Sequence, residues 1–411
     1  MRTTARWYIK FLQWKTQYLT HRQFILLLCG LVGVATGFAA LAMRSLTHFI
    51  EEVLVGNIIR YINYGFYVIF PAVGFLLVYW VKKYIIRKEV SHGIPSILYA
   101  VAKQKGIMKR FQAYGSILTA PITIGFGGSV GLEGPMVVTG AGISSQVARL
   151  FHINQSDRML LLACACAAAL AAIFKVPLAG ILFAIEVFGL DLTLSSLLPL
   201  FVASLSGVLT SYIFFGNAAL LPIYVGDSFL MHNIPFYLLL GVVGGFMSAY
   251  FTFVYEGVNR FFSKFSSAYL RIVIGGAILG LLVFVMPPLY GEGHEVINHL
   301  KAGHPELSIS SNIFGWNLEN PWVVILLLGG LVLFKVVATS VTFGAGGVGG
   351  IFSPMLFMGG VMGNCFARII NQIDILPYKL PLANFTLIGM TALMTGVLHA
   401  PLTAIFLIAE V

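Results

Sequence analysis

Two glycine-rich stretches hold the residue types and spacing in this sequence that could do chemistry. The first, residues 127–135, contains a single carboxylate, Glu133, directly before Gly134 and Pro135. The second, residues 346–354, repeats the glycine and proline spacing without the carboxylate. Proline is favoured in the first turn of a helix, and the glycines before it leave backbone N–H groups open to close approach. Each stretch therefore predicts a helix N-terminus able to bind a small anion.

The composition decides what surrounds these stretches. The chain has 411 residues, of which 58% are hydrophobic and 10% are charged, whereas a soluble domain carries about 25% charged residues. We therefore expect an all-α, polytopic, integral membrane protein. The net charge of +10 does not indicate nucleic acid binding, because the basic residues lie in short loops between apolar runs, which is the positive-inside pattern.

The distribution of basic residues orients the chain. Residues 1–23 interleave lysine and arginine with aromatic residues and contain no acid, which predicts an amphipathic helix on the cytoplasmic face. The second apolar run, near residues 65–86, ends at Lys82, Lys83, Arg87 and Lys88. We therefore expect the N-terminus in the cytoplasm and the protein in the plasma (inner) membrane.

A third helix start is predicted near residue 93. Ser91 to Pro95 opens an apolar run that ends near residue 102 and is too short to span a bilayer, as in a re-entrant helix. An ordinary loop turn is the alternative. His92 could donate to an anion or titrate near pH ~6.5, or be a plain interfacial histidine.

The chain contains an internal repeat. Besides the glycine stretches, residues 175–187 resemble residues 399–411, with Glu186 aligned to Glu410. Transporter repeats often run in opposite directions and place the site where broken helices meet. We assign residues 24–215 to the first repeat, 216–234 to the loop between repeats and 235–411 to the second. The second copy stops at residue 411, so we expect at least one further helix beyond this sequence.

These motifs together resemble the CLC family of chloride channels and chloride/proton antiporters, over nearly the whole chain. The matching elements are Ser91 to Pro95, Gly131 to Pro135 and Gly350 to Pro354. The resemblance implies a homodimer with one pore per subunit, each built from two inverted halves of tilted and re-entrant helices. It also implies that Glu133 is the gate. The anion-binding residues it implies are His92, Gly93, Leu132, Glu133, Gly134, Ile351, Phe352 and Ser353.

The sequence departs from the family pattern at positions that bear on coupling. His92 replaces a serine, Leu132 replaces a basic residue, and the internal proton-transfer glutamate aligns with Val187, beside Glu186. We therefore expect channel-like or only weakly proton-coupled transport, with a coupling role for Glu186 or Val187 and chloride/proton antiport as open alternatives. Chloride is the expected anion, and nitrate, bromide and fluoride remain open.

An anion inside a bilayer loses its hydration, and the helix N-termini predicted at the two glycine-rich stretches could compensate for that loss. A bare ion pays a solvation cost of order 20 kcal/mol, and each helix N-terminus offers about half a positive charge. Neither stretch contains lysine or arginine, which would hold an anion too tightly for conduction. Ionised Glu133 could occupy the anion's place and block the path. The alternative is a first-turn glutamate that only stabilises its helix.

A rival function from another class remains. Gly127, Ser129 and Gly131 match the Gly-x-Ser-x-Gly nucleophile pattern, with His92 or His399 as the base of an intramembrane serine hydrolase. The second stretch has Val348 in place of the serine, so the glycines recur without the nucleophile. We expect no enzyme activity, no cofactor and no metal site.

Overall fold

The computed structural model of the chain describes residues 18–59, 65–88, 90, 93–191, 193–216, 230–304, 318–374 and 376–410. His92 and Val411 lie outside these residues. So do residues 1–17 of the predicted N-terminal helix and residues 217–229 of the predicted loop between repeats. In the described part, all regular elements are helices, apart from one isolated β-bridge between Gly131 and Gly350.

The helices up to residue 216 follow the apolar runs of the sequence. They are α2 (His21–Glu51), α3 (Phe66–Trp80), α4 (Gly93–Gln104), α5 (Gly115–Gly125), α6 (Glu133–Leu150), α7 (Gln155–Phe174), α8 (Pro177–Phe188) and α9 (Leu194–Phe215). Lys175 ends α7 in the left-handed conformation, with φ 64°, and Pro177 begins α8. The apolar sequence is therefore divided into two helices at these residues.

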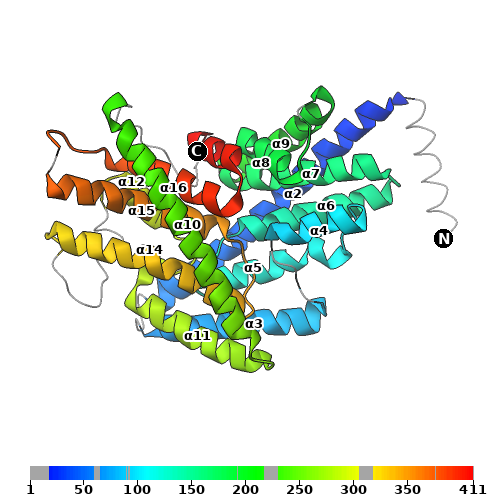
Figure 1. The fold of residues 1–411 in the computed structure, drawn as a ribbon. Helices are drawn as coiled ribbons and strands as arrows, with labels where there is room; N and C mark the ends of the chain where they lie inside the picture. Colours follow the sequence, from blue (N-terminus) through cyan, green and yellow to red (C-terminus); the bar gives the residue numbers. More distant parts are fainter. Residues whose placement is uncertain are drawn as a thin grey trace.

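The helices after residue 230 are α10 (Ile234–Ser263), α11 (Ala268–Val285), α12 (His294–Lys301), α14 (Pro321–Gly344), α15 (Phe352–Ile373), α16 (Leu382–Leu398) and α17 (Pro401–Glu410). Figure 1 shows α6 and α15 leading away from the centre of the molecule in opposite directions. The sequence analysis did not predict α12.

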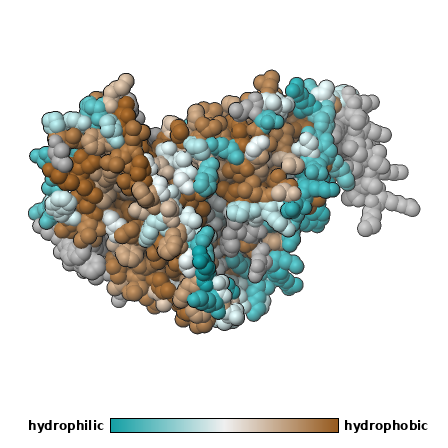
Figure 2. All heavy atoms as spheres, in the orientation of Figure 1, coloured by the Kyte–Doolittle hydropathy of each residue, from teal (hydrophilic) through white to brown (hydrophobic). Residues whose placement is uncertain are grey.

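Seven of the described helices are long and apolar enough to cross a bilayer, namely α2, α3, α7, α9, α10, α11 and α14, some with flanking turns. The prediction of an all-α polytopic membrane protein is confirmed. In Figure 2, hydrophobic residues cover most of the visible face, and hydrophilic residues gather toward the two ends of the helices and in a narrow central strip. This distribution is that of a protein surrounded by lipid.

One face of α10 is suited to lipid. Leu238, Val242, Phe246 and Phe253 are all exposed on it. Their spacing places the first three on one side of the helix. A stripe of large apolar side chains that no other described segment covers is costly in water but favourable against acyl chains.

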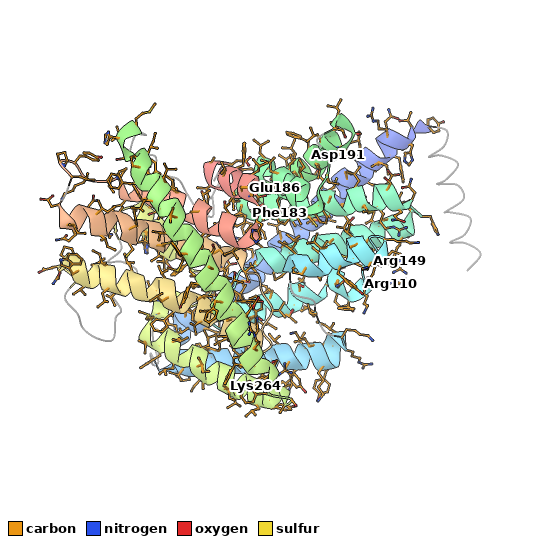
Figure 3. The ribbon with its side chains drawn as sticks, viewed as in Figure 1. Arg110, Arg149, Phe183, Glu186, Asp191 and Lys264 are labelled. Carbon is orange, nitrogen blue, oxygen red and sulfur yellow. The ribbon has the colours of Figure 1, made fainter. Side chains whose placement is uncertain are left out.

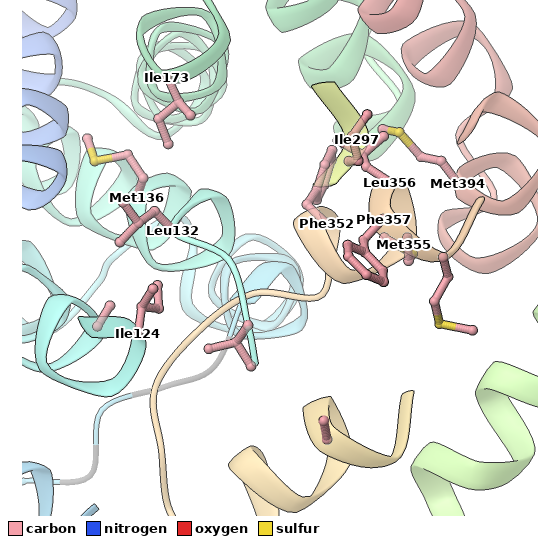
Figure 4. Packing of buried hydrophobic residues seen from close by; sticks show 14 of the residues in the cluster. Ile124, Leu132, Met136, Ile173, Ile297, Phe352, Met355, Leu356, Phe357 and Met394 are labelled. Atoms are coloured by element: carbon pink, nitrogen blue, oxygen red, sulfur yellow. The ribbon is translucent and has the colours of Figure 1, made fainter. Parts of the chain in front are cut away.

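The interior brings the beginnings of α6 and α15 close together. Met136 of α6 and Phe352, Met355 and Phe357 of α15 are fully buried or nearly so. Figure 4 shows these side chains, with Leu132, packed around the two helix starts. Close packing around both starts restricts their movement relative to each other.

Helices α15 and α16 are in direct backbone contact through glycines. A methyl group on Gly389 would lie 2.9 Å from the Cα of Gly363 and would collide with the carbonyl oxygen of Gly359. Small residues at such crossings let membrane helices approach closely. A side chain at Gly389 would therefore push the two helices apart.

We predict that Gly389→Ala destabilises the protein by about 1–3 kcal/mol, the usual cost of overpacking. The measurement is the melting temperature of the purified protein in detergent. Gly329→Ala is the matched control, because no atom lies within 4 Å of the added methyl group in α14 and alanine favours a helix. Equal melting temperatures for the two variants would contradict the packing described here.

Candidate functional site

The two glycine stretches pair with each other through their backbones. Gly131 N–H donates to the Gly350 carbonyl oxygen at 2.9 Å, and Gly350 N–H donates to the Gly131 carbonyl oxygen at 2.8 Å. Helices α6 and α15 begin two residues after this bridge. A methyl group on Gly134 would lie 2.9 Å from the Gly350 Cα. Glycine is therefore needed for the two helix N-termini to come this close.

Two threonines complete the pairing in a symmetric way. The Thr123 hydroxyl accepts from Val348 N–H at 3.0 Å, and the Thr342 hydroxyl accepts from Ser129 N–H at 3.1 Å. Gly127 and Gly346 have nearly equal left-handed φ angles of 96° and 95°. The sequence analysis missed both threonines, although they are separated by the same number of residues as the two glycines.

Three helix starts meet in one cavity. A cavity of about 460 Å³ is lined by the first residues of α4, by Gly134 of α6, and by residues 349–352 at the start of α15. The predicted site residues among its lining are Gly93, Gly134, Glu186, Val187, Ile351 and Phe352. Leu132, Glu133 and Ser353 adjoin these residues in the chain without lining the cavity. The structure thus brings together residues from four separate segments.

Glu133 adjoins in the chain one residue that lines this cavity and one that lines a smaller cavity. Its neighbour Gly134 lines the large cavity, and its other neighbour Leu132 lines a cavity of about 20 Å³ together with Arg44 and Glu292. The Glu133 side chain is fully buried. Its Oε1 accepts a hydrogen bond from the Ser353 hydroxyl, and its Oε2 has no partner among the described residues. The buried carboxylate therefore lies next in the chain to residues that line two different cavities, and it lines neither of them itself.

Glu292 and His294 also belong to this site, and the sequence analysis missed them. Leu132 N–H donates to Glu292 Oε1 at 2.7 Å. His294 Nδ1 lies 3.4 Å from Glu292 Oε2, and its Nε2 lies 3.1 Å from the Ser353 hydroxyl. The signal was the segment from Gly291 to His294, where two titratable residues alternate with two glycines between apolar helices.

Opposing effects act on the pKa of Glu292, which lies outside the predicted spans. Burial raises the pKa of this carboxyl. His294, the Leu132 amide and Arg44 stabilise the ionised form, and together they bring the pKa below its ordinary value. Glu292 is therefore a carboxylate at neutral pH, and it occupies the amide of Leu132, a predicted anion-binding residue.

A buried cation holds the segment that carries these residues. Lys335 of α14 is fully buried. Its Nζ donates to the Gly291 carbonyl oxygen at 2.9 Å and lies 4.7 Å from the centre of the Phe357 ring. The sequence analysis did not single out this lysine, although a lone charge inside an apolar span is the usual mark of an internal partner.

The family model described as "Voltage gated chloride channel" matches residues 73–411. The chain belongs to the voltage-gated chloride channel (CLC) family. The H(+)/Cl(−) exchange transporter ClcA of Salmonella arizonae is 27% identical over 400 residues, which are 94% of this chain and 80% of that protein.

Solved structures support the same fold. A CLC-type fluoride/proton antiporter superposes with a TM-score of 0.77 at 21% identity, over 95% of this chain and 91% of that one. A slow cyanobacterial Cl−/H+ antiporter also gives 0.77, at 22% identity, over 95% of this chain and 89% of that one. At these identities the likeness concerns the fold alone.

In this CLC protein the aligned glutamates of the repeat bind each other's helices. Glu186 at the end of α8 accepts hydrogen bonds from Leu402 N–H at 2.8 Å and Thr403 N–H at 2.7 Å, at the start of α17. Glu410 at the end of α17 accepts from Leu178 N–H at 3.1 Å and Ala179 N–H at 2.9 Å, at the start of α8. Each carboxylate satisfies N–H groups that have no partner within the helix.

Figure 3 shows Glu186 near the end of α8, with Phe183 one turn earlier. Glu186 and Val187 both line the large cavity. The coupling role considered for these two residues stays a prediction. The two hydrogen bonds from α17 show that Glu186 also joins the end of α8 to the start of α17.

We predict that Glu186→Ala lowers the free energy of unfolding by about 1–3 kcal/mol, because two N–H groups lose their acceptor. Denaturant or thermal unfolding in detergent measures this loss. Glu256→Ala is the control, since Glu256 pairs with Arg260 on an exposed surface of α10, where an ion pair contributes little. A Glu186→Ala protein as stable as the control would show that the reciprocal contacts do not stabilise the fold.

Proposed function

We propose that this protein transports chloride, or a similar small anion, across a membrane through the large cavity, and that Glu133 gates the path. The observation that carries the proposal is the meeting of three helix N-termini in one cavity. Among the described residues, none that lines this cavity is a lysine or an arginine. Backbone dipoles and N–H groups are then the source of positive potential.

Uncharged donors suit a transport site. Three helix N-termini offset roughly one negative charge, which compensates much of the cost of removing an anion from water. A lysine in the same place would bind the anion as a permanent ion pair and slow its release. Gly93, Gly134, Ile351 and Phe352 border the cavity and are the proposed anion-binding residues.

Leu132 and Ser353 have a different proposed role from the anion-binding residues. The Leu132 amide is bonded to Glu292, so an anion can bind this amide only after the Glu292 carboxylate moves. The Ser353 hydroxyl is bonded to Glu133. Both residues therefore hold carboxylates in the resting arrangement rather than an anion. His92 remains a proposed contributor to the anion site.

In this proposal Glu133 closes the path, because its carboxylate is buried at the start of α6 and its neighbours Leu132 and Gly134 line the two cavities. When it is protonated it loses its charge, and it no longer competes with an anion for the helix N-termini. Acid pH should therefore open the path. The protonated fraction of a single carboxyl changes about tenfold per pH unit above its pKa, which is enough to control flux.

Proton coupling is a second proposal, favoured by the names of the relatives. The aligned Salmonella protein is called an exchange transporter, and both solved structures are titled antiporters. In this chain Val187 cannot carry a proton, and both Glu186 oxygens accept hydrogen bonds from α17. We therefore propose channel-like or weakly coupled transport over tight antiport.

The hydrolase alternative has no support from the geometry around Ser129. The Ser129 hydroxyl is fully buried and has no hydrogen-bond partner among the described residues. A nucleophilic serine needs a base within hydrogen-bond reach. We propose no enzymatic role for this chain.

The orientation and assembly follow the sequence expectations. We propose a cytoplasmic N-terminus, because the basic loops lie at that end of the spans, and a location in the plasma (inner) membrane of the cell. Helix α12 then lies toward the outside. We also propose a homodimer, as the family resemblance implies.

We predict that Glu133→Ala makes anion flux nearly independent of pH, because the titrating blocker is gone. Chloride efflux from liposomes between about pH 5 and pH 8 should vary by less than about twofold in the variant and by about tenfold or more in the natural protein. Glu52→Gln is the control, since this acid is exposed at the end of α2. Unchanged pH dependence in Glu133→Ala would refute the gate.

We also predict that a chloride gradient drives little uphill proton movement. The measurement is the reversal potential under crossed chloride and pH gradients, which should follow the chloride gradient alone. A reversal potential that responds to both gradients at a fixed ratio would establish antiport instead.

A further inference from the structure

A chain of hydrogen-bonding groups leads from Glu133 to the partly exposed carboxylate of Glu292. Ser353 donates to Glu133 Oε1, His294 Nε2 lies 3.1 Å from the Ser353 hydroxyl, and His294 Nδ1 lies 3.4 Å from Glu292 Oε2. The exposed fraction of the side chains rises along the chain, from 0% at Glu133 to 10% at His294 and 18% at Glu292. This series of hydrogen-bonding groups therefore connects the buried carboxyl of Glu133 with the protein surface on the α12 side.

The proton positions along this chain are determined by what each group can donate. Ser353 has one hydroxyl proton, which goes to Glu133, so its oxygen must accept a proton from His294 Nε2. An ionised Glu292 only accepts, so His294 Nδ1 also carries a proton. His294 is then an imidazolium between two carboxylates.

The same groups can transfer a proton to Glu133. The Nε2–H bond of His294 breaks as its proton joins the Ser353 oxygen, and the original Ser353 proton passes to Glu133 Oε1. Proton count and net charge are conserved. Glu133 becomes a neutral acid, and His294 becomes a neutral imidazole whose Nε2 has lost its proton. A new proton reaches Nε2 from the α12 side when the ring rotates and this nitrogen faces the partly exposed Glu292.

We propose that Glu292, His294 and Ser353 form a proton relay that delivers protons to Glu133 from the α12 side. This inference rests on the proposed function of Glu133 as the gate. His294 is the donor, Ser353 passes the proton, and Glu292 stabilises the imidazolium and faces the side from which His294 is protonated again. Glu292 is itself positioned by the amide of Leu132.

The surrounding charges keep Glu292 ionised. The charged groups that act on it from the neighbouring elements are Arg44 and Glu51 of α2, Glu133 of α6, His294 of α12 and Lys335 of α14. Arg44 and Lys335 attract Glu292, and Glu51 repels it. Because Glu292 stays a carboxylate, the mobile proton is the one on Nε2.

A purely structural role for these residues gives different expectations. If Glu292 and His294 only fastened the loop to α6, their removal would lower stability and flux at every pH alike. A relay predicts a selective loss of the response to acid on one side of the membrane. Ser353→Ala is the sharpest test, because it removes the hydroxyl and leaves every charge in place.

The experiment measures anion current across a planar bilayer while the pH is changed on one side at a time. The proteins are the natural chain, Ser353→Ala, His294→Gln, Glu133→Gln and Glu295→Gln. Glu295 is the matched control, because it is an exposed acid next to His294 in the chain. Currents in H2O and D2O at matched acidity give a second readout, since a relay of two proton transfers slows in D2O.

For the natural protein and Glu295→Gln, current should rise with acid on the α12 side. In Ser353→Ala and His294→Gln, the ratio of current at about pH 5 to that at about pH 7.5 should fall by at least about threefold, because a general acid is lost. The isotope effect should fall with it.

The controls separate the two proposals. If Glu133→Gln removes the acid response while Ser353→Ala and His294→Gln retain the full response and isotope effect, the relay is wrong and the gate stands. If Glu133→Gln itself keeps the acid response, the gate fails, and the relay fails with it.

Discussion

The site depends on how the backbone N–H groups at helix starts are satisfied in an apolar environment. An unpaired N–H costs several kcal/mol in hydrocarbon, so a helix that begins inside the membrane needs an acceptor at its N-terminus. Here the glycine stretches pair at Gly131 and Gly350 and through Thr123 and Thr342. This pairing fixes α6 and α15 while their first turns remain directed at carboxylates and at the cavity.

At several helix starts of this protein, carboxylates accept the hydrogen bonds of backbone N–H groups. Glu292 accepts from Leu132 just before α6, Glu186 accepts from the start of α17, and Glu410 accepts from the start of α8. Glu133 differs from these three because one of its oxygens has no partner among the described residues. A carboxylate with fewer hydrogen bonds is easier to displace, which accords with the proposed gate.

Sequence reasoning predicted most of the helices and the starts of α6 and α15, because apolar runs, glycines and prolines are local signals. It missed Thr123 and Thr342, whose role exists only when the two stretches face each other. It also missed α12, Glu292, His294 and Lys335. Their function depends on contacts between segments that are 160 residues apart in the case of Leu132 and Glu292, and no local pattern reveals such a contact.

The most direct test of the central claim is to locate a bound anion. Anomalous diffraction from crystals grown or soaked in bromide would reveal heavy anions within the protein. The account predicts a bromide peak in the large cavity, in contact with backbone N–H groups at the starts of α6 and α15 near Gly134 and Phe352. Bromide peaks confined to the protein surface, with the cavity empty at saturating bromide, would contradict it.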